Sequence, residues 1–145
     1  ADRFIRPASV IGRNGKSLDD AWAVRPTAFN AVTLPDFPNF FMLNGPTGPV
    51  GNFSLIDIAE AQWKYVDQLI DRLRAGNARA VEPTHEAMAD YEEKRIAAAK
   101  KTIFGSGCTS WYLDDTGVPA SWPWSYQAFV DAMAKPDFED YRFAA

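Results

Sequence analysis

The stretch FPNFFMLNGPTGPVGNFSLIDIAEAQ, residues 37–62, decides which fold is predicted for this chain of 145 residues. It contains an apolar run, a turn rich in glycine and proline, and the start of an amphipathic segment. The apolar run, residues 39–43, is typical of a strand that is buried on both faces, as in a parallel sheet. The stretch therefore predicts a strand, a turn and a helix, which is the layout of a nucleotide-binding turn.

The glycines of this turn do not have the spacing of a dinucleotide-binding motif. That motif reads G-x-G-x-x-G, whereas the turn reads GPTGPVG over residues 45–51. The first N–H groups of the following helix still carry partial positive charge, so they could attract the electron-rich edge of a bound ring. On spacing alone, an ordinary connection between a strand and a helix is the preferred interpretation.

A helix over residues 54–74 has the strongest signal in the chain. Ser54 followed by Asp57 resembles a capping box, and Gly76 with Asn77 provides a stop signal. The side chains that recur at helical spacing are Leu55, Ile58, Ala59, Gln62, Val66, Leu69 and Leu73.

Weaker signals predict further helices at residues 17–22, 83–102 and 125–134 within otherwise irregular chain. Residues 1–36 are expected to be an irregular lead-in. The sequence as a whole predicts a mixed α/β fold in which helices dominate.

Composition excludes several classes of function. A formal net charge of −4 and scattered basic residues argue against a nucleic-acid binder, and no apolar run approaches the ~20 residues of a membrane span. One cysteine excludes an internal disulfide framework and favours a reducing, cytoplasmic location. One histidine argues against a multi-histidine metal site, so no metal is expected.

Three other features have both a functional and a structural interpretation. The aromatic residues from Trp111 to Trp124 form either a platform that stacks on a ring or sugar, or a lid that closes the core. His85 is interpreted as a solvated residue at a helix start, and Cys108 as a buried thiol, because no nucleophile motif accompanies either residue.

The order of the segments resembles the C-terminal part of the class B flavin monooxygenases, which are the Baeyer–Villiger and flavin-containing monooxygenases. The similarity extends over residues 4–141. The segments that carry it are GRNG at 12–15, FPNFFMLNGPTGPVGNFS at 37–54, CTSWYLDDTG at 108–117 and WPWSY at 122–126.

This resemblance implies an FAD- and NADPH-dependent monooxygenase built as a doubly wound flavoprotein with two dinucleotide-binding domains. Residues 37–76 would complete the FAD-binding domain, and residues 77–145 would add a helical and aromatic-rich segment. NADPH would reduce FAD, and a peroxyflavin would then transfer one oxygen atom from O2 to a small organic substrate, either a ketone or a soft heteroatom.

The resemblance also implies which residues bind the cofactors. The turn and the helix start would face the flavin ring, and a tryptophan would lie near the nicotinamide. The residues so implied are Asn44, Gly45, Pro46, Asn52, Phe53, Ser54, Leu55 and Trp111. No catalytic residue is implied, because the family's monooxygenase fingerprint and its catalytic arginine lie upstream of the segment that matches.

The chain is therefore expected to be a single C-terminal fragment that is inactive and binds neither cofactor tightly on its own. A doubly buried strand needs neighbours, so the isolated chain is expected to self-associate as a dimer or larger. Two alternatives stay open: a stand-alone module that binds a small ligand through the aromatic segment, and a subunit that completes a partner's sheet.

Overall fold

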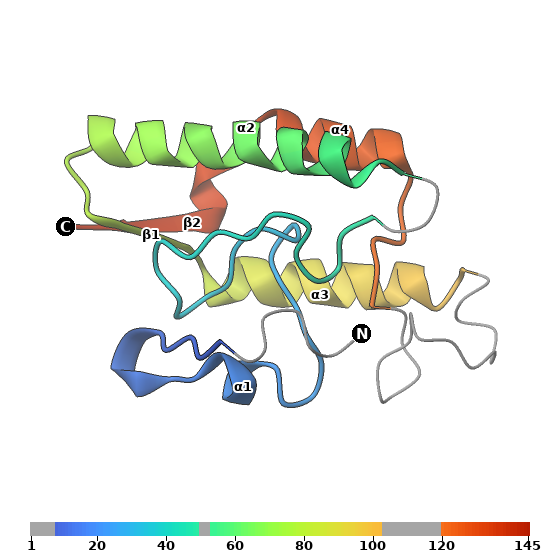
Figure 1. The fold of residues 1–145 in the computed structure, drawn as a ribbon, viewed down its shortest axis with the longest axis horizontal. Coiled ribbons are helices and arrows are strands. Elements are labelled where there is room, and N and C mark those ends of the chain that lie inside the picture. Colours follow the sequence, from blue (N-terminus) through green and yellow to red (C-terminus); the bar gives the residue numbers. More distant parts are fainter. Residues whose placement is uncertain (1–7, 50–52, 103–119) are drawn as a thin grey trace.

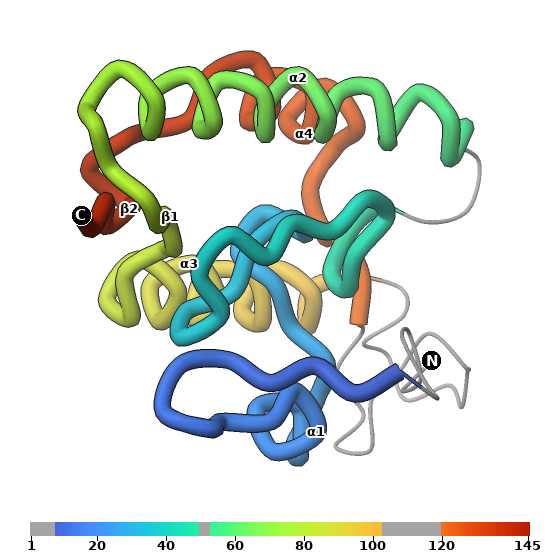
Figure 2. The backbone as a smooth tube through the Cα atoms, turned by 60° about the vertical axis from the view of Figure 1, so that its left-hand side comes forward, coloured from blue at the N-terminus to red at the C-terminus, as the bar shows by residue number. Residues whose placement is uncertain are grey.

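The computed structural model describes residues 8–49, 53–102 and 120–145. Helix α2 (Leu55–Ala75) packs beside helix α4 (Tyr126–Ala134), and helix α3 (His85–Ala99) lies below them (Figure 1). Figures 1 and 2 both show the last part of the irregular chain before α2, drawn in teal, running between α2 and α3, whereas the chain around α1 lies on the side of α3 away from α2. The described part of the chain is thus a mixed α/β structure dominated by helices, as predicted.

Helix α2 confirms the strongest prediction from the sequence. Ser54 has extended backbone angles, and its hydroxyl accepts a hydrogen bond from the backbone N–H of Asp57. At the other end, Gly76 is the C-cap, and Asn77 follows in the left-handed conformation with φ 53°. Local capping chemistry therefore sets both ends of this helix.

The remaining helices also begin at capping hydroxyl groups. Ser17, Thr84 and Ser125 each accept a hydrogen bond from a backbone N–H group three residues further on. These caps confirm the predicted helices, although α3 is shorter than residues 83–102. The described ranges also contain α1 (Leu18–Ala21), which Ser17 caps, and the 3-10 turns η1 (Arg13–Gly15) and η3 (Phe138–Asp140).

A two-stranded antiparallel ribbon, which the sequence did not predict, closes one end of the fold. Strand β1 (Ala80–Pro83) pairs with strand β2 (Tyr141–Ala144), and Val81 lies opposite Phe143. Each strand has only four residues, and β1 ends in a proline that cannot donate a hydrogen bond. Such short segments give little periodic signal, and their pairing depends on residues far apart in the sequence.

The predicted buried strand at residues 39–43 is wrong. Asn39 has φ 58°, which breaks an extended run at its first residue. The N–H of Asn39 donates to the Val81 carbonyl, its Oδ1 accepts from the Val81 N–H, and its Nδ2 donates to the Arg79 carbonyl. Within this run the hydrogen bonds to β1 come from Asn39, and Leu43 at the end of the run is exposed instead of buried.

The main core contains a chain of buried hydroxyl groups as well as apolar side chains. The hydroxyl oxygens of Tyr65 and Tyr141 lie 2.6 Å apart, and that of Tyr141 lies 3.1 Å from Thr33 Oγ1. The apolar residues of this core include Phe29, Val32, Ile58, Val66, Leu69, Val81, Phe129 and Met133. The hydroxyl chain therefore connects α2, β2 and the irregular chain through the centre of the molecule.

Burial changes the acidity of these tyrosines. Desolvation raises the pKa of Tyr65 to about 12, and it raises the pKa of Tyr141 well above 10.0. Both hydroxyl groups are thus neutral donors and acceptors near neutral pH. None of the helices in the described ranges combines the length and hydropathy that a membrane crossing requires.

The raised tyrosine pKa values predict a loss of stability at high pH. The unfolded chain releases these protons near pH ~10, whereas the folded chain retains them, so the free energy of unfolding should fall as pH rises from about 10 to about 12. Urea unfolding at a series of pH values, followed with tyrosinate absorbance, measures this loss. The Tyr65→Phe variant should lose less stability over the same interval. Equal losses in both proteins, or none, would contradict the prediction.

Candidate functional site

The turn at residues 44–48 is held by one fully buried amide side chain from α2. The N–H of Asn44 donates to Gln62 Oε1 at 2.6 Å, and Gln62 Nε2 donates to the carbonyl of Ala31 at 3.2 Å. A buried amide that satisfies two backbone groups stabilises an irregular segment, because either group would cost free energy if left unpaired. Gln62 thus binds two separate loops to the same helix.

The turn also contacts the start of α2 directly. Asn44 Nδ2 donates to the carbonyl of Leu55 at 3.2 Å. Ser54 caps the helix at this point, so the positive end of the helix dipole lies beside the turn. The structure therefore brings together the two segments that the resemblance placed near a flavin.

Left-handed backbone conformations are concentrated in the two loops that Gln62 connects. Asn30, Ala31, Asn44 and Thr47 have φ values of 51°, 64°, 52° and 70°. The left-handed region of backbone angles costs free energy for alanine and more for a β-branched threonine. Residues held in this conformation often occur at functional sites. The local shape is therefore fixed by tertiary contacts rather than by backbone preference.

Gly45 lies where the two loops approach each other closely. A Cβ atom at this position would lie 2.5 Å from the carbonyl oxygen of Ala31 and 3.1 Å from Cβ of Met42. Backbone atoms leave no room for a side chain here, which explains glycine at this position. The close approach also keeps the turn against the preceding loop.

The described end of the aromatic segment, residues 120–124, contacts the turn. The N–H of Trp122 donates to the carbonyl of Gly48 at 3.0 Å. The Trp122 ring meets Trp124 edge-on at 4.8 Å and Phe129 edge-on at 5.3 Å between centroids. Both tryptophans are partly buried against the core, which supports the interpretation as a lid for this described end of the segment.

The six described residues of the predicted cofactor site differ in exposure. Asn44 is exposed, Gly45 is half-buried and Pro46 is buried. Phe53, Ser54 and Leu55 are exposed, and the Phe53 ring stacks on Tyr126 at 4.7 Å. The predicted residues Asn52 and Trp111 lie outside the described residues, as does Cys108.

Exposed apolar side chains surround the start of α2. Leu55 and Ile56 are 60% and 72% exposed, and Trp63 is 56% exposed two turns further along the same helix. Leu43 and Phe53 add to this group, which we call the helix-start surface. Apolar groups gathered in this way mark a surface suited to contact with another molecule or segment.

His85 is a largely exposed residue at the start of α3, as predicted, and it lies beside a surface ion cluster. Its Nε2 lies 2.9 Å from Asp36 Oδ1, while Lys16 Nζ lies 3.0 Å from Asp36 Oδ2. Burial would raise the pKa of Asp36, but the hydrogen bonds from Lys16 and His85 outweigh it and hold the pKa below 3.8. Arg13 pairs with both Asp36 and Glu82, so the cluster joins the N-terminal loops to β1 and α3.

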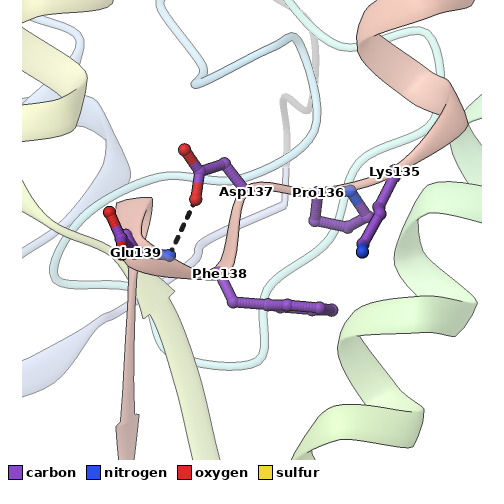
Figure 3. A pocket seen from close by; sticks show the side chains of 5 residues that line it. All are labelled: Lys135, Pro136, Asp137, Phe138 and Glu139. Carbon is purple, nitrogen blue, oxygen red and sulfur yellow. Dashed lines mark hydrogen bonds between the residues drawn. The ribbon is translucent and has the colours of Figure 1, made fainter.

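One surface pocket lies away from the turn (Figure 3). It has a volume of about 430 Å³ and is lined by residues 135–139. Phe138 points toward α2, where the Arg72 guanidinium lies 4.9 Å from the ring centroid. Arg72 is near the end of α2, which at 1.5 Å per residue is about 25 Å from Leu55. The pocket is therefore separate from the candidate cofactor site.

Sequence reasoning missed the residues that support the turn. Gln62 was grouped with the apolar side chains of α2, although a polar residue at a buried helical position is itself a signal of a specific partner. Thr47 gave no local signal, because its hydroxyl group bonds to the Ala28 carbonyl and the Tyr91 hydroxyl, which are distant in the sequence. In the described ranges, no group of three or more acidic, cysteine or histidine side chains could hold a metal ion.

The lack of space around Gly45 predicts that even a methyl group at this position lowers the stability of the protein. Gly45→Ala should lower the free energy of unfolding by about 1–3 kcal/mol, because the new methyl group overlaps a backbone carbonyl. Gly76→Ala is the matched control: its Cβ would lie 3.4 Å from the Arg72 carbonyl and its φ is −89°, so its effect should stay within about 0.5 kcal/mol. Thermal or urea unfolding of both variants measures the difference. Equal stability of the two variants would show that the loops do not approach this closely.

Comparisons with known proteins identify relatives along almost the whole chain. A monooxygenase of Mycobacterium tuberculosis is 39% identical over 145 residues, which is 98% of this chain and 29% of the relative. An FAD-binding monooxygenase of Aspergillus niger is 33% identical over 147 residues, which is 95% of this chain and 24% of the relative. No protein-family model matches the chain.

Solved structures give the same result. The crystal structure of cyclohexanone monooxygenase from Rhodococcus sp. Phi1 bound to NADP+ matches with a TM-score of 0.80 and 26% identity, over 94% of this chain and 27% of that one. Oxidized steroid monooxygenase bound to NADP matches with a TM-score of 0.83 and 26% identity, over 94% of this chain and 26% of that one. The chain thus spans less than a third of the proteins that it matches. It is a homologue of one part of the flavin-dependent monooxygenases, with Baeyer–Villiger enzymes as its structural neighbours, and the resemblance seen in its sequence is confirmed.

Proposed function

We propose that this chain forms the C-terminal part of the FAD-binding domain of an FAD- and NADPH-dependent monooxygenase. The whole enzyme would insert one oxygen atom from O2 into a ketone or a soft heteroatom of a small organic substrate, via a peroxyflavin. The observation that carries the proposal is the direct contact between the 44–48 turn and the capped start of α2, in a chain whose relatives are FAD-binding monooxygenases.

The residues at this place suit a flavin ring. The helix-start surface offers exposed apolar side chains that a planar ring would cover, and the positive end of the α2 dipole lies beside them. A helix start favours negative charge on a neighbouring group, and such charge develops on a flavin when it is reduced. FAD would supply the redox chemistry, while this part of the protein would supply shape and charge.

The turn would offer a backbone of fixed orientation. Since the N–H of Asn44 already donates to Gln62 Oε1, Asn44 would meet the ring through its carbonyl and its exposed side chain rather than through this backbone N–H. Gly45 and Pro46 follow it in the turn. Asn52 at the helix start and Trp111 near the nicotinamide complete the proposed cofactor site, and a cytoplasmic location fits a chain with one cysteine.

Flavin binding tests this proposal. FAD fluorescence is titrated with the 145-residue chain and with the full-length protein that contains it. We expect saturable quenching, and flavin reduction by NADPH, only with the full-length protein, because this chain has no phosphate-binding G-x-G-x-x-G sequence. Absence of FAD binding by the full-length protein would contradict the proposed function. Tight binding by the 145-residue chain would instead favour a stand-alone binding module.

The helix-start surface also predicts self-association of the isolated chain. Ile56 and Trp63 are seven residues apart on α2 and thus share one face, so a second copy can bury both. We expect a dimer or larger assembly at micromolar concentration in light scattering. Trp63→Glu should shift the chain toward monomer, whereas Val24→Glu, at an exposed apolar position outside this surface, should not. A monodisperse wild-type monomer would contradict the expectation.

A further inference from the structure

We infer that Tyr91 and Arg95 of α3 are positioning residues for the 44–48 turn, and that through it they tune the flavin site. The inference rests on the proposed function, and it deepens it by adding a second helix to the support of the site. The two residues are four apart, so they lie on one face of α3. Neither is part of the surface proposed to face the cofactor.

Tyr91 supports the turn through Thr47. The Thr47 hydroxyl donates to the carbonyl of Ala28 at 3.1 Å, so the Tyr91 hydroxyl, 3.0 Å away, is the donor to Thr47 Oγ1. Thr47 is buried and has φ 70°, which is unfavourable for a β-branched residue. The two hydrogen bonds therefore hold a backbone conformation that Thr47 would not keep on its own.

The Tyr91 ring is itself fixed by its surroundings. Phe29 meets it edge-on at 5.5 Å between ring centroids, and the rings of Trp122 and Trp124 lie at 6.5 and 6.2 Å. Tyr91 is buried, and desolvation raises the pKa of its hydroxyl, so the proton needed for the bond to Thr47 is retained. The hydroxyl thus has a defined position before any ligand binds.

Arg95 supports the same turn by a second route. Its fully buried guanidinium donates to the Glu92 carboxylate at 2.7 and 3.1 Å, and its Nη1 donates to the carbonyl of Ser121 at 3.4 Å. The next residue, Trp122, donates its N–H to the Gly48 carbonyl. A buried guanidinium needs such partners, because an unpaired charge in the interior is very costly.

The turn is therefore anchored on both sides of its proposed flavin-facing part. Gln62 of α2 holds it at Asn44, and α3 holds it at Thr47 and Gly48. Gly45 and Pro46 lie between these anchors. Backbone dipoles that are fixed in advance stabilise charge better than dipoles that must reorient, so loosening one anchor should change how well the site favours reduced over oxidised flavin.

The test compares two matched substitutions in the full-length protein. Tyr91→Phe removes the hydroxyl that supports Thr47, whereas Tyr141→Phe removes an equally buried hydroxyl that contacts Thr33 and Tyr65 and not the turn. The first readout is amide hydrogen exchange of Gly48 and Trp122 without cofactor. We expect exchange about fivefold faster or more in Tyr91→Phe, the factor that accompanies loss of one net hydrogen bond, and little change in Tyr141→Phe.

The second readout is the midpoint potential and visible absorption spectrum of bound FAD. Tyr91→Phe should shift the potential to more negative values and perturb the spectrum, while Tyr141→Phe should leave both near wild type. A role in stability alone would lower the melting temperature of both variants and leave the flavin signals equal, which would overturn the inference. Failure of the wild-type protein to bind FAD would contradict the proposed function instead, and hydrogen exchange would still decide whether Tyr91 holds the turn.

A second pair of variants decides the question if Tyr91→Phe does not fold. Thr47→Val keeps the shape of the side chain but removes its hydroxyl, and Thr47→Ser keeps the hydroxyl. Thr47→Val should reproduce the faster exchange and the potential shift, and Thr47→Ser should restore both toward wild type. Equal behaviour of these two variants would show that the hydroxyl contacts do not position the turn.

Discussion

The buried side chain of Gln62 is the contact on which the irregular half of this molecule depends. The chain between α1 and α2 contains no strand or long helix among its described residues, so its backbone N–H and carbonyl groups have few regular partners. Burying such groups without partners is costly, and side chains from the helices must supply them. Gln62 does this for two loops at once, at Asn44 and at Ala31.

Side-chain hydrogen bonds hold irregular segments elsewhere in the core as well. Asn39 pairs with the edge of β1 that β2 does not cover. The hydroxyl groups of Thr33, Tyr141 and Tyr65 form one chain. The Thr47 hydroxyl bonds to both Ala28 and Tyr91. A polar core of this kind stabilises less than an apolar core of the same size, but it admits few alternative arrangements when all its members are paired. The left-handed residues in the two loops can therefore persist, because the surrounding contacts determine them.

The sequence predicts the local features of this fold and misses those that depend on distant partners. The helix starts at Ser17, Ser54 and Ser125 could be predicted because a cap requires only its own first turn. The run at residues 39–43 has the composition of a strand, yet its first residue, Asn39, is left-handed and pairs with β1 through both its N–H and its side chain. The proposed cofactor residues came from the family resemblance, whereas Gln62, Tyr91 and Arg95 emerged only from the geometry.

The pairing of β1 with β2 affects the order in which this segment can fold during its synthesis. β2 is the last element of the described chain, and it provides both the partner strand of β1 and the Tyr141 hydroxyl at the centre of the core. On the ribosome, α2 and α3 can form early because their contacts are local, but the edge of β1 has no partner strand until residues 141–144 emerge. The pairing of β1 therefore forms only after residues 141–144 have been translated. Until then, the buried hydroxyl chain is incomplete and the nascent protein is open to association with other chains.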